Sequence, residues 1–181
     1  MPACSFFRRR RSSFTDRAVA IRRHRAGELV IEQTRDLVRV REMLARAGMM
    51  TDGIEWPPAC YIVAYVGDEA VGVIGVESKI DAALIRSLYV NESARRRGIG
   101  SALVAAARKA AHTRGARHLY LFSTEAGAFF GRHGFMPVAV ADVIAAIPGV
   151  PQIEYYRARP QQLAREFAYH LDISGDGVIE R

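Results

Sequence analysis

The sequence predicts an α/β fold with a mixed central sheet. In residues 61–90, apolar runs of strand length are separated by turn residues, which indicates an antiparallel meander. From residue 99 the apolar period becomes helical, and another strand-like run follows at 118–122. A strand reached through a helical crossover is expected to lie parallel to the strand before it. With 181 residues, the chain fits one domain.

The first elements are a short strand at 29–31 and an amphipathic helix after it. The apolar face of this helix is formed by Leu37, Val40, Leu44 and Ala47. Thr34 or Asp36 is available as its N-cap, and Gly48 suits its C-terminus. A loop containing Trp56, Pro57 and Pro58 leads to the meander.

The meander consists of strands at 61–66, 71–76 and 82–90, with Gly67-Asp68 as a hairpin turn and Asp81 before the third strand. The apolar face of the next helix is formed by Ile99, Leu103, Ala107 and Ala110. Gly115 is placed to end this helix, before the strand at 118–122.

The remaining segment is predicted in less detail. A short helix at about 126–133 stops at Gly134, and 135–140 returns as a strand. Pro148, Pro151 and Pro160 interrupt the chain that follows, and 167–173 is predicted to form a final edge strand.

The net charge of +7 is confined to the N-terminus. Residues 1–27 contain eight arginines and one acid, Asp16, so residues 28–181 hold 18 basic and 18 acidic groups. We therefore divide the chain into a basic extension (1–27), a domain (28–173) and a tail (174–181). The neutral domain is not expected to bind nucleic acid. The extension is open to three interpretations: a dispensable segment, an electrostatic arm or a transit peptide.

Cysteine content and hydropathy restrict the class of protein further. Cys4 and Cys60 form neither a disulfide framework nor a zinc motif, which favours the cytoplasm. No apolar run reaches the roughly 18 residues that a membrane-spanning helix needs. Asp172-x-Ser174-x-Asp176-Gly177 resembles the start of a calcium loop but lacks its final glutamate, so we predict no metal site.

The clearest chemical motif is the loop Arg95-Arg96-Arg97-Gly98-Ile99-Gly100-Ser101, which opens directly into a helix. The free N–H groups of a first helical turn favour an anion, and glycines let the backbone approach it. A Walker A motif is absent, and Leu103 stands where a dinucleotide fingerprint needs its third glycine. The alternative is a solvated basic loop at a helix start.

The spacing Arg95-x-x-Gly98-x-Gly100 after a strand resembles the acetyl-coenzyme A loop of the GNAT acetyltransferases. The segment 128–135, a short helix ending in Gly134-Phe135, is similar to the second motif of that family. The resemblance implies a GNAT-like mixed, splayed sheet and acetyl-coenzyme A as co-substrate. The residues it implies in cofactor binding are Leu88, Tyr89, Val90, Arg95, Arg96, Arg97, Gly98, Ile99, Gly100, Ser101 and Phe130.

A narrower resemblance concerns the acceptor. Glu77, the run 82–88, and Ala128-Phe129-Phe130 before Gly134-Phe135 resemble the acetyltransferases of bacterial arsenic-resistance operons. This implies acetylation of a small amino-acid-like amine, with arsenic- or phosphinate-containing amino acids as candidates. The alternatives are acetylation of a protein N-terminus or lysine, and a non-catalytic acyl-coenzyme A sensor. No membrane partner is expected, and a homodimer is left open.

Acyl transfer needs a base for the amine and benefits from a proton donor for the thiolate. Many GNAT enzymes use a tyrosine as donor, where this sequence has Phe130. Tyr89 and Ser123 are the candidate substitutes, unless they are packed strand residues; Ser123 is also a candidate for acceptor binding.

Glu77, at the end of an apolar strand, is our preferred candidate for the base, and Glu125 is a weaker one. Arg86 interrupts an interior strand, which is costly unless it pairs with an anion. It is expected either to hold an acidic group of the acceptor or to form a structural ion pair with Glu77.

Overall fold

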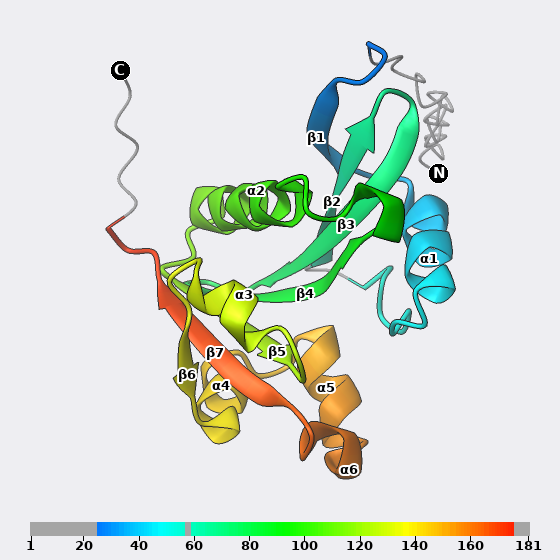
Figure 1. Cartoon of the computed structure of the whole chain (residues 1–181). Coiled ribbons are helices and arrows are strands. Elements are labelled where there is room, and N and C mark those ends of the chain that lie inside the picture. Colours follow the sequence, from blue (N-terminus) through cyan, green and yellow to red (C-terminus); the bar gives the residue numbers. More distant parts are fainter. Residues whose placement is uncertain (1–24, 57–58, 176–181) are drawn as a thin grey trace, which may run out of the picture.

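A computed structural model describes residues 25–56 and 59–175, which form a seven-stranded mixed sheet with helices on both faces (Figure 1). The strand order is β1-β2-β3-β4-β5-β7-β6. Most of the predicted N-terminal extension and of the C-terminal tail, together with Pro57 and Pro58, lies outside the described residues.

The first four strands form the predicted antiparallel meander: β1 (Leu29–Thr34), β2 (Ala59–Val66), β3 (Glu69–Ser78) and β4 (Ala82–Val90). Helix α1 (Leu37–Arg46) lies between β1 and β2, and Asp36 caps it by accepting a hydrogen bond from Arg39 N at 3.0 Å. Helix α2 (Ile99–Thr113) then leads to β5 (His118–Ser123), which pairs with β4 in parallel. The predicted fold class is confirmed.

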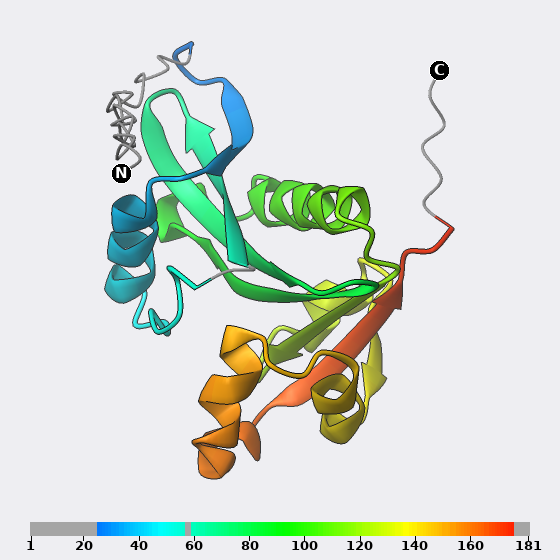
Figure 2. The same ribbon diagram turned by 180° about the vertical axis from the view of Figure 1, so that it is seen from behind.

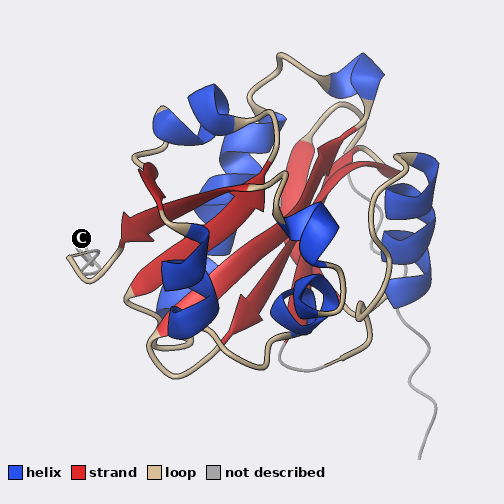
Figure 3. Cartoon of the chain, turned by 90° about the horizontal axis from the view of Figure 1, so that it is seen from below, coloured by secondary structure: helices blue, strands red, loops and turns tan. Residues whose placement is uncertain are grey.

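Alternation along the strands divides the core between two faces. In β2, Ile62 and Ala64 pack in the cluster under α2, whereas Tyr61 and Val63 pack in the cluster under α1. Figures 2 and 3 show the sheet from behind and from below, with helices on either side of it. Side chains that alternate along a strand therefore belong to different core clusters, one on each face of the sheet.

Strand β4 is irregular at the point where it leaves β5. Its pairing with β5 covers only Ala82–Ile85 against His118–Leu121. Its register against β3 shifts between Val73 and Gly75, and Ser87 has a left-handed φ of 56°. A bulge of this kind bends the strand and changes the side to which later side chains point.

The C-terminal strands differ from the sequence-based prediction. Strand β7 (Phe167–Asp172) is not an edge strand, because it lies between β5 and β6 (Met136–Val138). The edge is β6, whose Pro137 has no N–H to donate to a further strand. The strand predicted over 135–140 is shorter because Val140 already begins helix α4 (Val140–Ala146).

Two of the prolines that were interpreted as interruptions in fact begin helices. Pro151 and Pro160 occupy the first turns of α5 (Pro151–Arg157) and α6 (Pro160–Leu163), where a missing N–H costs nothing. Val143 and Ile153, from α4 and α5, pack against Leu84 on the sheet face opposite α2. A further short helix, α3 (Gly127–Gly131), follows β5.

Gly75, opposite the bulge, allows the close packing of β3 on its neighbours. A Cβ added there would lie 2.7 Å from Tyr61 Cε1 and 2.8 Å from Arg86 Cγ. We expect Gly75→Ala to lower the free energy of unfolding by about 1–3 kcal/mol, because a methyl group overpacks this site. Gly131→Ala is the control, since nothing lies within 4 Å of its added Cβ. Thermal melts of equal midpoint for the two variants would contradict this expectation.

Candidate active site

Two cavities meet where β4 separates from β5. The loop cleft, of about 570 Å³, is lined by Leu88, Val90, Ala94, Arg95, Arg96, Gly98, Ile99, Gly100, Ser101, Ala126, Phe129 and Arg132. The second cavity, the aromatic pocket, has a volume of about 580 Å³. Leu88 and Ala126 line both, so the two cavities adjoin at these residues.

The loop cleft is built on the start of α2. Gly98 caps the helix with a left-handed φ of 77°, and the first hydrogen bond of α2 runs from Ala102 N to Gly98 O at 3.0 Å. The amides of residues 99–101 precede this bond and have no partner within the helix. A Cβ on Gly100 would lie 3.4 Å from Phe129 Cζ, on the wall of the cleft.

Three arginines surround these amides. Arg95, Arg96 and Arg132 line the cleft, whereas Arg97 does not. Arg95 is held by the carbonyl of Val90, which accepts a hydrogen bond from its Nε at 3.0 Å. Free amides, a helix N-terminus and cations together favour an anionic ligand with phosphate groups.

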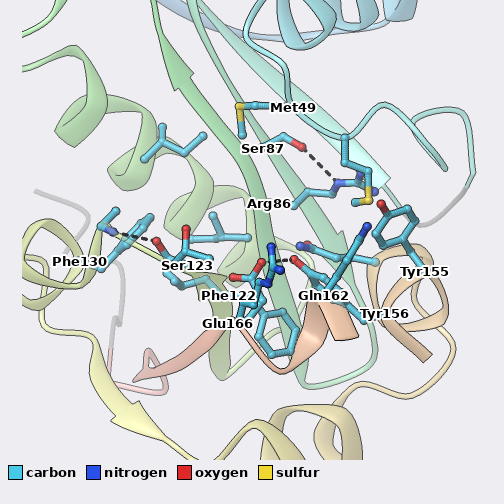
Figure 4. Close-up of a pocket in the computed structure, with 18 of the residues that line it drawn as sticks. Met49, Arg86, Ser87, Phe122, Ser123, Phe130, Tyr155, Tyr156, Gln162 and Glu166 are labelled. Carbon is cyan, nitrogen blue, oxygen red and sulfur yellow. Dashed lines mark hydrogen bonds between the residues drawn. The ribbon is translucent and has the colours of Figure 1, made fainter. Parts of the chain in front are cut away.

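The aromatic pocket is formed by segments far apart in the sequence (Figure 4). Its lining consists of Gly48, Met49, Met50, Ile85, Arg86, Ser87, Leu88, Leu121, Phe122, Ser123, Thr124, Ala126, Phe130, Gln152, Tyr155, Tyr156, Gln162, Arg165 and Glu166. Sequence reasoning named Arg86, Leu88, Ser123 and Phe130, but it missed every contribution from α5 and α6. The tyrosine pair just after Pro151, on a helix that begins there, was the signal that could have revealed them.

Glu77 and Arg86 form a buried ion pair, the second of the two alternatives left open by the sequence. Glu77 Oε1 lies 2.5 Å from Arg86 Nη1, and neither side chain is exposed. Glu77 Oε2 accepts a hydrogen bond from Gln152 N at 3.0 Å. Arg86 also donates from Nη2 to Asp52 O at 3.0 Å and from Nε to Ser87 Oγ at 3.3 Å.

In this geometry Glu77 does not line the aromatic pocket. Both of its oxygens are engaged. Each nitrogen of the Arg86 guanidinium makes one hydrogen bond, and the side chain has no exposed surface, so the arginine is not placed to hold a substrate anion. The pair connects β3, β4, the loop at residue 52 and α5.

The candidate proton donors lie in different places. Tyr89 lines neither cavity and packs with the cluster under α1. The bulge in β4 explains the position of Tyr89, because it shifts the alternation of side chains by one residue. Leu88 and Val90 therefore lie on the same face of the sheet as Ile85, and Tyr89 lies on the opposite face. Ser123 does line the aromatic pocket, where its Oγ accepts a hydrogen bond from Ala126 N at 2.9 Å.

Phe130 is buried in the wall of the aromatic pocket, and Glu125 is exposed outside it. Tyr156 donates to Glu166 Oε1 at 2.7 Å. Burial, and then this bond to Glu166, raise the pKa of Tyr156 above its usual range, so the phenol stays protonated.

Within residues 25–56 and 59–175, no group of three or more His, Cys, Asp or Glu could hold a metal, and no helix is long and apolar enough to cross a membrane.

Residues 57–137 match the family model of the acetyltransferase (GNAT) domain. This segment, 81 of the 181 residues, has the sequence pattern of a GNAT acetyltransferase domain. No curated protein matches the sequence significantly.

Solved structures show the same fold at low identity. The N-acetylglutamate synthase of Neisseria gonorrhoeae, in complex with coenzyme A and N-acetyl-glutamate, is 17% identical over 81% of this chain, with a TM-score of 0.63. This chain spans only 35% of the length of that synthase. A GNAT-family acetyltransferase from Staphylococcus aureus is 13% identical over 81% of this chain and 99% of its own, with a TM-score of 0.62. Ard1 from Thermoplasma volcanium is 20% identical over 80% of this chain and 97% of its own, with a TM-score of 0.59.

The ion pair predicts a stability effect without a catalytic one. Glu77→Gln leaves Arg86 buried without its counter-charge, so we expect the free energy of unfolding to fall by about 3–5 kcal/mol. For a domain of this size that is a loss of roughly 6–20 °C in melting temperature. The kcat of the folded fraction, measured well below that temperature, should stay within about threefold. A kcat lowered by about 10² or more with an unchanged melt would restore Glu77 as the base.

Proposed function

We propose that this protein is a cytoplasmic N-acetyltransferase that moves the acetyl group of acetyl-coenzyme A to the amino group of a small, amino-acid-like acceptor. One observation carries the proposal: the loop cleft and the aromatic pocket meet at Leu88 and Ala126, where β4 leaves β5. A thioester reaching this point from the cleft would meet an amine held in the pocket.

The cleft suits the cofactor in both charge and shape. The pyrophosphate would bind the amides of residues 96–101, with Arg95, Arg96 and Arg132 as counter-charges. The backbone of Leu88–Val90 no longer pairs with β5, so its polar groups on that side can pair with the amide groups of the pantetheine arm. Arg97 and Tyr89 are left out of this assignment, because neither lines the cleft.

The pocket suits a small acceptor. Its volume of about 580 Å³ and its aromatic and methionine lining are typical of small-molecule sites. The structural neighbour from Neisseria gonorrhoeae contains an N-acetylated amino acid, which supports an amino acid as acceptor. Arsenic- and phosphinate-containing amino acids stay among the candidates.

The chemistry is a direct transfer. The amine lone pair attacks the thioester carbonyl, and the thiolate leaves as the amide forms. Phe130 cannot donate a proton to the sulfur, but Ser123 lies in the pocket with its hydroxyl proton available, since its Oγ serves as acceptor to Ala126 N. A thiolate is a weakly basic leaving group, so this donor contributes modestly.

The proposed function is tested by thiol release from acetyl-coenzyme A with a panel of amines: the common amino acids, phosphinothricin, arsinothricin, a lysine peptide and a peptide with a free N-terminus. We expect turnover with at least one free amino acid to exceed that with both peptides by about tenfold or more in kcat/KM. Turnover of peptides alone would favour a protein acceptor. Binding of acetyl-coenzyme A with no turnover of any amine would favour a sensor.

Gly100 tests the cofactor assignment. A valine there would place its methyl groups between the helix amides and Phe129, so we expect Gly100→Val to weaken acetyl-coenzyme A binding at least about 100-fold, with the fold retained. Gly131→Val is the control, because Gly131 does not line the cleft. Calorimetric titration with acetyl-coenzyme A measures the affinity of both variants. Equal affinity of Gly100→Val and Gly131→Val for the cofactor would contradict the assignment.

A further inference from the structure

The aromatic pocket contains three charged side chains among the described residues: Arg86, Arg165 and Glu166. Arg86 is neutralised by Glu77 and has no exposed side-chain surface. The charges that a bound molecule can contact are therefore those of Arg165 and Glu166, two consecutive residues between α6 and β7.

Glu166 is positioned for a cation. Its Oε1 accepts the hydrogen bond from Tyr156, and its Oε2 accepts none among the described residues. Tyr156 is buried and its ring packs edge-on against Phe122 at 5.3 Å between centroids, so the donor is itself fixed. A partly buried carboxylate with one oxygen held and the other free is suited to an alkylammonium group.

Arg165 offers the opposite charge. It is exposed, and its guanidinium has no ion pair or hydrogen bond within the described part of the chain. A guanidinium binds a carboxylate or an oxyacid through two parallel hydrogen bonds. Arg165 and Glu166 both line the aromatic pocket, so one bound molecule can contact both charges.

We propose that Glu166 binds the ammonium group of the acceptor and removes its proton, and that Arg165 binds an acidic group of the same molecule. The acceptor class is thus an amino acid that carries both charges. The inference rests on the proposed function and deepens it, because it assigns the base and the specificity residue that Glu77 and Arg86 do not supply.

The ammonium group loses one proton to Glu166 Oε2, which later returns it to water. The neutral amine attacks the carbonyl carbon, the C–N bond forms, and the C–S bond breaks with its electron pair going to sulfur. A second proton leaves the nitrogen and ends on the thiolate, so the products are the N-acetyl amino acid and coenzyme A.

Glu166 is tested with two acceptors: the amino acid identified by the amine panel and its aminooxy analogue, whose amino group is neutral at neutral pH. For phenylalanine, the analogue is α-aminooxy-β-phenylpropionate. We expect Glu166→Gln to lower kcat by about 10²–10⁴ with the amino acid and by less than about fivefold with the analogue. Gln keeps the bond from Tyr156. Glu154→Gln, on the exposed side of α5 and outside the pocket, is the control and should match the unmodified protein.

Arg165 is tested by removal of the acidic group from the acceptor. We expect Arg165→Ala to raise KM about 10- to 100-fold for the amino acid and less than about threefold for the amine without its carboxyl group. Arg157→Ala, which also removes an exposed arginine but lies outside the pocket, should leave both values unchanged.

The outcomes separate the two proposals. Equal losses with the amino acid and its analogue, or none, would overturn the role of Glu166, while acetyl transfer by the unmodified protein would still stand. An equal rise in KM for both acceptors would overturn the role of Arg165. Absence of any acetyl transfer by the unmodified protein would instead overturn the proposed function itself.

Discussion

The separation of β4 from β5 is the constraint on which the rest of the site depends. The two strands pair over only four positions and then diverge, and Ser87 takes a left-handed conformation just beyond this point. Such a conformation is costly for a residue other than glycine, so the surrounding structure must enforce it. The two cavities share Leu88, just beyond the divergence, and the edge of β4 that we propose to pair with the pantetheine arm is open only because β5 has left it.

The buried pair of Glu77 and Arg86 holds this irregular region together. Burying two charges costs several kcal/mol per ion, and their attraction offsets this only when the remaining donors and acceptors are satisfied. Here they are satisfied by Gln152 N, Asp52 O and Ser87 Oγ, which belong to three different segments. The pair therefore connects α5 and the loop at residue 52 to the bulge.

The sequence predicted those parts of the molecule whose signals are local. Alternation predicted the meander, helical period predicted α1 and α2, and the glycines at 98 and 100 predicted the loop cleft. The bulge at Ser87 has no local signal, and it alone decides that Leu88, and not Tyr89, faces the cleft. The order of β7 and β6 and the burial of Glu77 under α5 depend on contacts between distant segments, which periodicity does not encode.

The segment that matches the family model includes the whole lining of the loop cleft but only part of the lining of the aromatic pocket. Every residue that lines the loop cleft lies within residues 57–137, which match the GNAT family model. Much of the aromatic pocket lies outside that range, in residues 48–50 and in the segment from Gln152 to Glu166. A domain that uses one co-substrate with many acceptors needs a constant cofactor cleft and a variable pocket. Helix α6 buries none of its residues, so this part of the pocket can vary in sequence without disturbing β4, and acceptor specificity is physically free to change there.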